Sequence, residues 1–403
     1  MLRSNLAFNQ IRGPLIYRGN QCLQRMKLAA AGPGAQDTAM NEASILTPHQ
    51  LLPTSGARRV VPFEMDGTLY LGVPQLAEDI EGTPAYMNGG NSDIDALFYR
   101  WVDNRFVEAE RIRVPGGEDL APFSVGGQRF LATASVRTGS GPYDLNASST
   151  VFRRESAGWM AHQSIPTFAA KQCYPFTFDG RCFLGLALGV TLPGVEARHP
   201  RNSCILEWDG AAFRDFQTLE GGWGYGFCHF EIGQERFLAY ADHTSASLLY
   251  RWDGQQFAVL QRFSEQGGRA FRFFTTGDAA WLTFANISGE SLLYRWDGGE
   301  FVRHQSLGGA GGRAFELFQA SGGLYLIRVC FIEGTPAAPK TDLLSQVYRW
   351  EGERFQVIAQ FPTFGGTDAA MFTRQGQRYL AVANSLTSEV RFRQDTVIYR
   401  LQC

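Results

Sequence analysis

Segment 268–306 shows the pattern of apolar and polar positions that recurs along most of the chain. Apolar residues alternate with polar ones over Arg269–Thr275, and short apolar runs follow at Trp281–Asn286, Ser291–Trp296 and Phe301–Leu307. Turn residues separate these runs, among them Asp297-Gly298, which favours a two-residue hairpin turn. The pattern predicts four short strands, here called A to D in chain order, that form one antiparallel sheet, the blade of a β-propeller.

The same unit recurs, and a leucine in strand B marks each copy. The seven markers are Leu71, Leu131, Leu184, Leu238, Leu282, Leu326 and Leu380. In six copies the marker lies 30 residues after the residue that ends strand C of the preceding copy, as from Trp252 to Leu282. A phenylalanine stands eight residues before every marker. Such constant spacing indicates a repeat fold in which each copy is one supersecondary unit.

The two ends of the repeat array predict how it closes. Counting back from Leu71 places a lone strand D at about residues 45–52, whereas the last copy stops after strand C, at Tyr399-Arg400-Leu401. The N-terminal strand therefore completes the last blade and removes the free sheet edges that an open array would leave. We predict an all-β, seven-bladed β-propeller of four-stranded antiparallel blades over residues 44–403, closed by this N-terminal strand D.

Residues 1–43 lie outside the repeat. They carry basic residues and no acid before Asp37, a bias that resembles a mitochondrial presequence. The alternatives are a disordered leader or a later start at Met26 or Met40. An apolar core typical of a secretory signal is not evident, so we favour a cytoplasmic location while an extracellular or mitochondrial one stays open.

Composition narrows the classes of partner. The chain has 37 Lys and Arg against 39 Asp and Glu, a net charge of −2. This balance gives no reason to expect nucleic acid, and no apolar run is long enough for membrane insertion. The seven cysteines are scattered, without the spacing of a zinc site or a disulfide framework. We expect a monomeric propeller.

Almost all variation in length falls between strands B and C. From marker leucine to the end of strand C the distances are 30, 23, 24, 14, 14, 24 and 21 residues. The longer loops form five inserts, at 75–97, 136–149, 189–203, 331–345 and 385–396. In a propeller all B–C loops emerge on one face, beside the D–A loops, so a rigid scaffold would present them together as a binding surface. The alternative is that surface loops simply tolerate insertion.

The unit SLLYRWDGQQFAVLQRF followed by GGRAFRFFTTGDAAWLTFAN resembles the EAR repeat, also called the EPTP or epitempin repeat. YLAVAN, IYRL, LYRWDG and FVRHQSL carry the same resemblance, which extends over residues 45–401. It implies a seven-bladed propeller as in the leucine-rich glioma-inactivated proteins, and protein–protein recognition, usually outside cells, without catalysis. The chain departs from those proteins in lacking leucine-rich repeats, a clear secretory signal and an evident disulfide pair.

We therefore predict a non-catalytic recognition propeller that binds a protein or peptide through its loop-rich face. Aromatic and arginine side chains are the usual anchors of such surfaces. The predicted partner-binding residues are Tyr86, Tyr143, Arg198, Arg201, Trp223, Phe331 and Arg391. Two other interpretations stay open: an enzyme or a small-ligand or metal-binding propeller that uses the mouth of the central channel, and a carbohydrate-binding propeller.

Two sets of oxygen-bearing residues are candidates for a calcium site, and calcium is the one cofactor that the sequence suggests. Asn91, Asp93 and Asp95 alternate along the longest insert, although Ala96 and Val102 stand where an EF-hand needs Gly and Glu. Asp242, Asn286 and Asn384 recur four residues after the marker leucine. The alternative for both sets is a solvated loop or an ordinary turn-starting residue. The resemblance adds that some family members hold calcium in the central channel.

Overall fold

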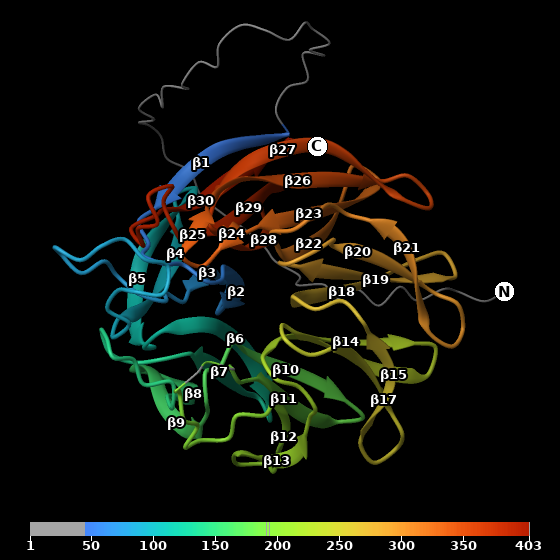
Figure 1. Cartoon of the computed structure of the whole chain (residues 1–403), viewed down its shortest axis with the longest axis horizontal. Coiled ribbons are helices and arrows are strands. Elements are labelled where there is room, and N and C mark those ends of the chain that lie inside the picture. The colour runs from blue at the N-terminus through green and yellow to red at the C-terminus, as the bar shows by residue number, and fades with distance from the viewer. Residues whose placement is uncertain (1–44, 191, 193, 403) are drawn as a thin grey trace, which may run out of the picture.

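The computed structural model describes residues 45–402 except 191 and 193, so the expectation for residues 1–43 lies outside the described part. Within that part the fold consists of strands, and no helix is assigned. Seven four-stranded antiparallel sheets surround one axis (Figure 1), which confirms the predicted propeller. The described residues include no helix that could cross a membrane.

Blades 1 to 3 follow one another from strand A, beside the axis, to strand D, at the outer edge. Blade 1 comprises β2 (Val61–Met65), β3 (Thr68–Val73), β4 (Asp95–Val102) and β5 (Arg105–Arg113). Blade 2 comprises β6 (Gly117–Val125), β7 (Gln128–Ser135), β8 (Ser148–Glu155) and β9 (Gly158–Pro166). Blade 3 comprises β10 (Gln172–Phe178), β11 (Arg181–Ala187), β12 (Cys204–Trp208) and β13 (Phe213–Thr218).

Blades 4 to 6 repeat this order. Blade 4 comprises β14 (Gly224–Ile232), β15 (Glu235–Asp242), β16 (Ser247–Trp252) and β17 (Phe257–Phe263). Blade 5 comprises β18 (Gly268–Thr276), β19 (Ala279–Asn286), β20 (Leu292–Trp296) and β21 (Phe301–Ser306). Blade 6 comprises β22 (Gly312–Ala320), β23 (Gly323–Cys330), β26 (Asp342–Trp350) and β27 (Phe355–Phe364). Its B–C insert adds a small hairpin of β24 (Glu333–Thr335) and β25 (Ala338–Lys340).

Blade 7 joins the two ends of the chain, as predicted. It comprises β28 (Gly366–Arg374), β29 (Gln377–Asn384), β30 (Thr396–Leu401) and, as its strand D, β1 (Leu46–Leu52). The register pairs Leu46 with Leu401 and Leu52 with Thr396, and all four side chains are buried. Figure 1 shows β1, in blue, beside the red β30. The described ring therefore closes through strand pairing.

Neighbouring blades are joined by a glutamine that recurs in strand D. The side-chain amide of Gln305 donates to the carbonyl of Phe355 at 2.7 Å, and its oxygen accepts from the Phe355 N–H at 2.9 Å. Four further pairs make the same reciprocal contact: Gln50–Phe106, Gln163–Phe213, Gln217–Phe257 and Gln261–Phe301. Next to these contacts, strand-end tryptophans pack against the adjacent blade, as Trp350 does on Trp281 at 4.9 Å. The constant repeat spacing thus serves the junctions between blades.

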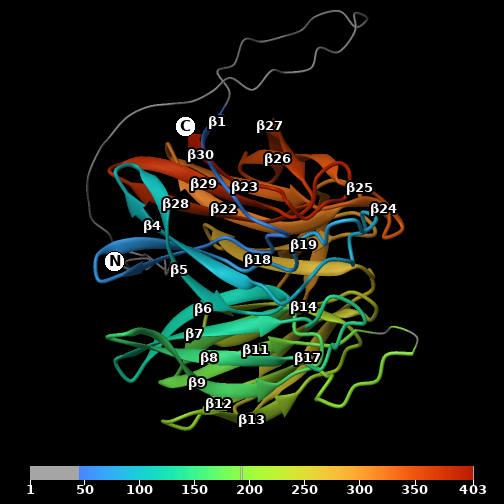
Figure 2. The same ribbon diagram turned by 90° about the vertical axis from the view of Figure 1, so that its left-hand side faces the viewer.

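The two faces of the propeller differ in the loops that they carry. The A strands line the axis, and the B–C inserts gather on one face, on the right in Figure 2. The hairpin of β24 and β25 lies on that face too. Because the start of each A strand also lies there, the D–A loops and the first residues of the A strands form the centre of this loop-rich face.

Candidate functional site

Contacts between neighbouring inserts order the rim of the loop-rich face. Arg198 of the blade 3 insert pairs with Asp144 of the blade 2 insert at 2.7 Å, and Asn146 Nδ2 donates to the Glu196 carbonyl at 3.2 Å. Arg391 of the blade 7 insert donates to the Thr83 carbonyl of the blade 1 insert at 2.9 Å. The predicted partner-binding residues Arg198 and Arg391 thus also hold adjacent inserts together.

Tyr143 joins the inserts of blades 1 and 2. Its hydroxyl donates to the Gly90 carbonyl at 2.7 Å, and the Arg137 guanidinium lies 3.7 Å from its ring centre. Arg137 also donates to the carbonyls of Asn88 and Gly89. Burial lowers the pKa of Arg137 to about 10, which leaves it charged at neutral pH. Tyr143 is therefore part of a packed cation–π contact and is half-buried.

The remaining predicted partner-binding residues differ in exposure. Tyr86 is 49% exposed, and Arg201 is exposed as well. Trp223 is half-buried, whereas Phe331 keeps only 7% of its surface. Phe331 belongs to a cluster of buried apolar residues from blades 1, 2, 3, 6 and 7 on this face, here called the collar. It comprises Leu76, Ala77, Met87, Val136, Phe168, Ala169, Val190, Phe331, Ile332, Leu386 and Phe392.

The three candidate metal residues after strand B are engaged in hydrogen bonds: Asp242 and Asn286 accept from the turns that follow them, whereas Asn384 accepts from Phe364 at the end of strand D of blade 6. Asp242 accepts from the backbone N–H groups of Trp223 and Ser245, among others, and from the Tyr240 hydroxyl. Asn286 accepts from two backbone N–H groups of the turn that follows it. Asn384 Oδ1 accepts from a backbone N–H, and its Nδ2 donates to a carbonyl. The contacts of Asp242 and Asn286 are those expected of turn-starting residues.

The oxygens of the first candidate set are also engaged within the fold. Asn91 Oδ1 accepts from the Asp93 N–H at 3.1 Å, and Asp93 Oδ1 accepts from the Gly139 N–H at 3.0 Å. Asp95 pairs with Arg113 at 3.5 Å. The described residues contain no group of three or more His, Cys, Asp or Glu side chains suited to a metal ion.

The centre of the loop-rich face holds a set of charged residues that the sequence analysis did not select. They occupy one repeat position, thirteen residues before the marker leucine, and lie in or just before strand A. This set, here called the mouth ring, comprises Arg58, Glu118, Lys171, Tyr225, Arg269, Arg313 and Thr367. Four of its members are cationic and one is acidic. The ring could have been found by reading this single position across all seven copies.

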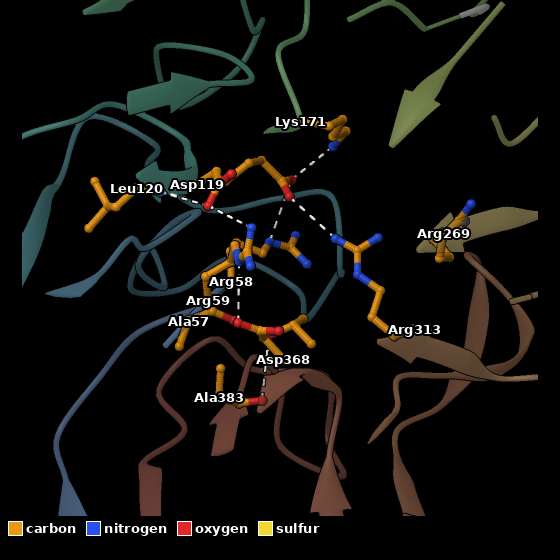
Figure 3. Close-up of polar contacts among 12 residues, drawn as sticks. Ala57, Arg58, Arg59, Asp119, Leu120, Lys171, Arg269, Arg313, Asp368 and Ala383 are labelled. Atoms are coloured by element: carbon orange, nitrogen blue, oxygen red, sulfur yellow. Dashed lines mark hydrogen bonds and ion pairs between the residues drawn. The ribbon is translucent and has the colours of Figure 1, made fainter. Parts of the chain in front are cut away.

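Glu118 is the carboxylate on which three of the ring cations converge. Its oxygens lie 2.8 Å from Lys171 Nζ, 3.5 Å from Arg313 Nη2 and 3.6 Å from Arg58 Nε. Figure 3 shows these three side chains directed toward that carboxylate. Burial alone would raise the pKa of Glu118, but the three cations outweigh burial and hold it at about 2. Glu118 is therefore ionised at neutral pH.

Arg269 lies apart from these ion pairs (Figure 3). Its guanidinium lies over the ring of Tyr225, 3.8 Å from the ring centre, and donates to the Gly268 carbonyl at 3.1 Å. Within the described chain it has no carboxylate at ion-pairing distance. Burial, with Arg313 as a further positive neighbour, lowers the pKa of Arg269 to about 10. Tyr225 also underlies Arg313 at 4.9 Å, so its ring is a platform for two cations.

Several buried polar atoms around Tyr225 have no hydrogen-bond partner. They are Arg269 Nε, Trp223 Nε1, His243 Nδ1, Glu118 Oε2 and Arg58 Nε, the last of which still lies 3.6 Å from the other oxygen of Glu118. Trp223 and His243 contact each other at 4.9 Å between ring centres, and both pack beside Tyr225. Burial and the positive charge of Arg269 lower the pKa of His243 to about 4, so this imidazole is neutral at pH 7. Unpaired buried polar groups are uncommon in folded proteins, so their concentration at the mouth marks this position.

A second charged layer lies one residue further along strand A. Arg59 Nη1 is 3.0 Å from Asp119 Oδ1, and Arg59 Nε is 3.3 Å from Asp368 Oδ2. These three residues, here called the Arg59 triad, belong to blades 1, 2 and 7. Asp119 additionally accepts from the N–H groups of Leu120 and Cys173, and Asp368 accepts from the N–H of Val60.

Beyond the Arg59 triad, toward the other face, lies a cavity of about 560 Å³. Phe63, Phe123 and Trp159 contribute apolar walls, and Arg272 and Glu316 contribute charge. Burial raises the pKa of Glu316 to about 7, with Arg272 acting in the opposite direction. Glu316 accepts a hydrogen bond from the Met371 N–H at 2.9 Å, so it also ties blade 6 to blade 7.

Fold and site together define a closed seven-bladed propeller with an ordered, loop-rich face and a cationic mouth. A family model described as the EPTP domain matches residues 212–253, 256–297, 300–351 and 354–402. Each match runs from strand D of one blade to strand C of the next, the register expected from the repeat spacing. The chain contains EPTP repeats within a seven-bladed propeller, and the prediction of EAR repeats is confirmed.

Two curated relatives carry the same repeat name. The protein described as "Thrombospondin-type laminin G domain and EAR repeat-containing protein" from Mus musculus is 27% identical over 168 residues, 40% of this chain and 24% of that protein. The Homo sapiens protein of that name is 28% identical over 154 residues, 38% of this chain and 22% of its own length. The aligned segment thus spans about a quarter of these relatives.

Among solved structures, one similar chain is a Bacteroides fragilis protein provisionally described as a 6-phosphogluconolactonase. The two folds align with a TM-score of 0.52 over 81% of this chain and 90% of the other, at 12% sequence identity. At that identity the likeness concerns the fold alone, because propellers support many unrelated functions.

Proposed function

We propose that this propeller is a recognition module that binds a protein or peptide partner across its loop-rich face. EPTP propellers commonly serve as protein-interaction domains, which supports this class of function. The observation that carries the proposal is the gathering of five inserts on one face, where side-chain contacts hold neighbouring inserts in place. A surface ordered before binding loses less conformational entropy when a partner docks.

Exposed apolar side chains on the inserts support the same surface. Tyr86 projects from the blade 1 insert, and Leu192 and Val195 project from the blade 3 insert. Tyr143 and Trp223 flank the centre with rings that are only partly buried. Aromatic side chains such as Tyr and Trp are enriched in protein-binding surfaces.

A paired set of surface variants tests the proposal. The loop-face variant combines Tyr86→Ser, Leu192→Ser and Val195→Ser. The control combines Val302→Ser and Val357→Ser, which are equally exposed but lie on the outer strands β21 and β27. Purified native protein and both variants are used to capture partners from the native lysate, with identification by mass spectrometry.

The expected result is a protein captured by the native chain and by the outer-strand control but lost with the loop-face variant. Its affinity for the loop-face variant, measured with purified components, should fall by about tenfold or more, the effect expected when exposed anchors are removed. A partner retained by the loop-face variant and lost with the outer-strand control would move the binding surface to the blade edges and contradict the proposal.

A further inference from the structure

The mouth ring has four cations and only one carboxylate to pair with them. We propose that a second carboxylate, carried by an acidic side chain of the bound partner, enters the mouth ring beside Tyr225 and pairs with Arg269. This inference rests on the proposed function and names the chemistry of the partner: an acidic peptide segment that docks over the centre of the loop-rich face.

Arg269 is the residue that calls for this second carboxylate. Its side chain is nearly enclosed, with 8% of the residue exposed, and no ion pair within the described chain balances its charge. Taking a guanidinium out of water without a counter-ion is costly, and the face of Tyr225 compensates only in part. Lys171 and Arg313 stand close to the same ring, at 5.7 and 4.9 Å from its centre, so further positive charge adjoins the position.

Unpaired donors beside Arg269 favour an oxygen ligand. The indole N–H of Trp223 and the Nε–H of Arg269 are groups that can only donate, and both are buried without an acceptor. Trp223 and Arg269 both pack against Tyr225. A carboxylate has two oxygens that accept several hydrogen bonds at once, so it suits a position where unpaired donors adjoin Tyr225.

Glu118 demonstrates that the mouth ring accommodates a carboxylate. It is held by Lys171, Arg313 and Arg58 at 2.8 to 3.6 Å, and its own ionised form is strongly stabilised there. Arg269, which also adjoins Tyr225, has no carboxylate at ion-pairing distance within the described chain. The pairing of Glu118 with three cations therefore suggests a carboxylate as the ligand of Arg269.

The surroundings favour a carboxylate attached to a partner rather than a free anion. The collar borders the mouth ring along blades 1, 2, 3, 6 and 7, and its Phe331 ring lies 5.7 Å from the guanidinium groups of both Arg58 and Arg313. The half-buried ring of Trp223, which packs beside Tyr225, gives contact area to the carbon stem of a glutamate side chain. A small hydrated anion would gain nothing from this ring.

The experiment compares three probes on the full chain by isothermal titration calorimetry at low salt: a blocked hexaglutamate peptide, succinate and inorganic phosphate. The variants are Arg269→Gln and a matched control, Arg303→Gln. Arg303 lies on the outer strand β21 and forms an exposed ion pair with Glu290, so the control also removes one positive charge. We expect the peptide to bind the native chain and Arg303→Gln equally, and Arg269→Gln about tenfold or more weakly. Glu118→Gln, which frees three cations, should bind the peptide more tightly than the native chain.

Several results would overturn the inference. Absence of peptide binding to the native chain, or equal losses in Arg269→Gln and Arg303→Gln, would show that no carboxylate site exists at the ring. Binding of phosphate or succinate without the peptide would assign the ring to a free anion. A lysate partner that is lost with the loop-face variant but kept by Arg269→Gln would leave the proposed function standing and remove the acidic contact alone.

Discussion

The mouth ring and the Arg59 triad are adjacent layers of the same channel, yet they balance charge in different ways. In the triad one guanidinium lies between two carboxylates and accounts for both, at 3.0 and 3.3 Å. In the mouth ring three cations converge on one carboxylate, and the fourth, Arg269, has none at ion-pairing distance. Every carboxylate of the triad contacts a cation and the triad joins blades 7, 1 and 2, whereas the mouth ring has a cation without a carboxylate and is suited to an acidic ligand.

The pKa values of two neighbouring residues, Glu118 and Asp119, show this difference in charge balance. Burial and the nearby Asp368 raise the pKa of Asp119 to about 7, against the opposing effect of Arg59. Three cations hold the pKa of Glu118, one residue earlier, at about 2. Because both carboxyl groups are buried, the contrast reflects the ratio of cations to carboxylates in each layer rather than access to water.

The largest expected effect comes from breaking the triad. Arg59→Leu leaves two buried carboxylates without their counter-ion at the closure of the ring, and we expect it to lower the free energy of unfolding by about 3–5 kcal/mol. Urea denaturation followed by tryptophan fluorescence measures this. Adding Asp119→Asn and Asp368→Asn should recover much of the loss, and a variant as stable as the native chain would contradict the structural role of the triad.

Acid should act on the mouth ring through Glu118. Its folded pKa lies below the unfolded value, so its ion pairs stabilise the fold above about pH 4.5, and this stability is lost as the pH falls toward about 2. The loss should amount to about 2–3 kcal/mol. Glu118→Gln should show a correspondingly shallower decline over this range when denaturation midpoints are compared at several pH values. An unchanged acid profile would mean that Glu118 is not paired in the folded state.

Removing the unpaired cation Arg269 should raise the free energy of unfolding, whereas breaking the triad should lower it. Arg269→Leu replaces a buried, uncompensated charge with an apolar side chain, and we expect the free energy of unfolding to rise by about 1 kcal/mol. Differential scanning calorimetry would detect the higher melting temperature. A destabilised variant would show instead that Arg269 is paired within the fold, and it would remove the central argument for a ligand.

The smallest effect belongs to the exposed pair of Arg303 and Glu290. Both side chains are about half exposed, and surface ion pairs contribute little once solvent screens them. Arg303→Gln should change the free energy of unfolding by less than about 0.5 kcal/mol. A larger change, measured by the same urea titration, would show that the effect of Arg269→Leu cannot be assigned to burial.

Most of the fold could be predicted from repeat spacing. The marker leucines place seven blades, and the lone apolar strand near residue 46 and the incomplete last copy together predict the closure that β1 and β30 form. Repeat positions such as Gln305 and Phe355 stand out in sequence, although their reciprocal hydrogen bonds could be described only in the structure. Alternation of apolar and polar residues predicts strands because a strand buries the side chains on one face of its sheet and exposes those on the other.

The candidate site was less accessible to sequence reasoning. Residues were selected there for their type and for lying in inserts, so Phe331 was included although it is buried in the collar. The mouth ring was missed because no two of its charged members are close in the chain, and none lies in an insert. Exposure depends on how loops from different blades cover one another, which local sequence does not record.

By itself, then, the sequence of this protein determined the repeat, its register and the strand that closes the ring, because these follow from periodic burial within each copy. Only the tertiary structure decided which side chains from different blades lie close together. Closing seven blades around one axis brings Arg58, Lys171, Arg269 and Arg313 together with a single carboxylate at the channel mouth. Electrostatic interactions depend on distance in space, so the charge imbalance that suggests an acidic partner arises only in the closed ring.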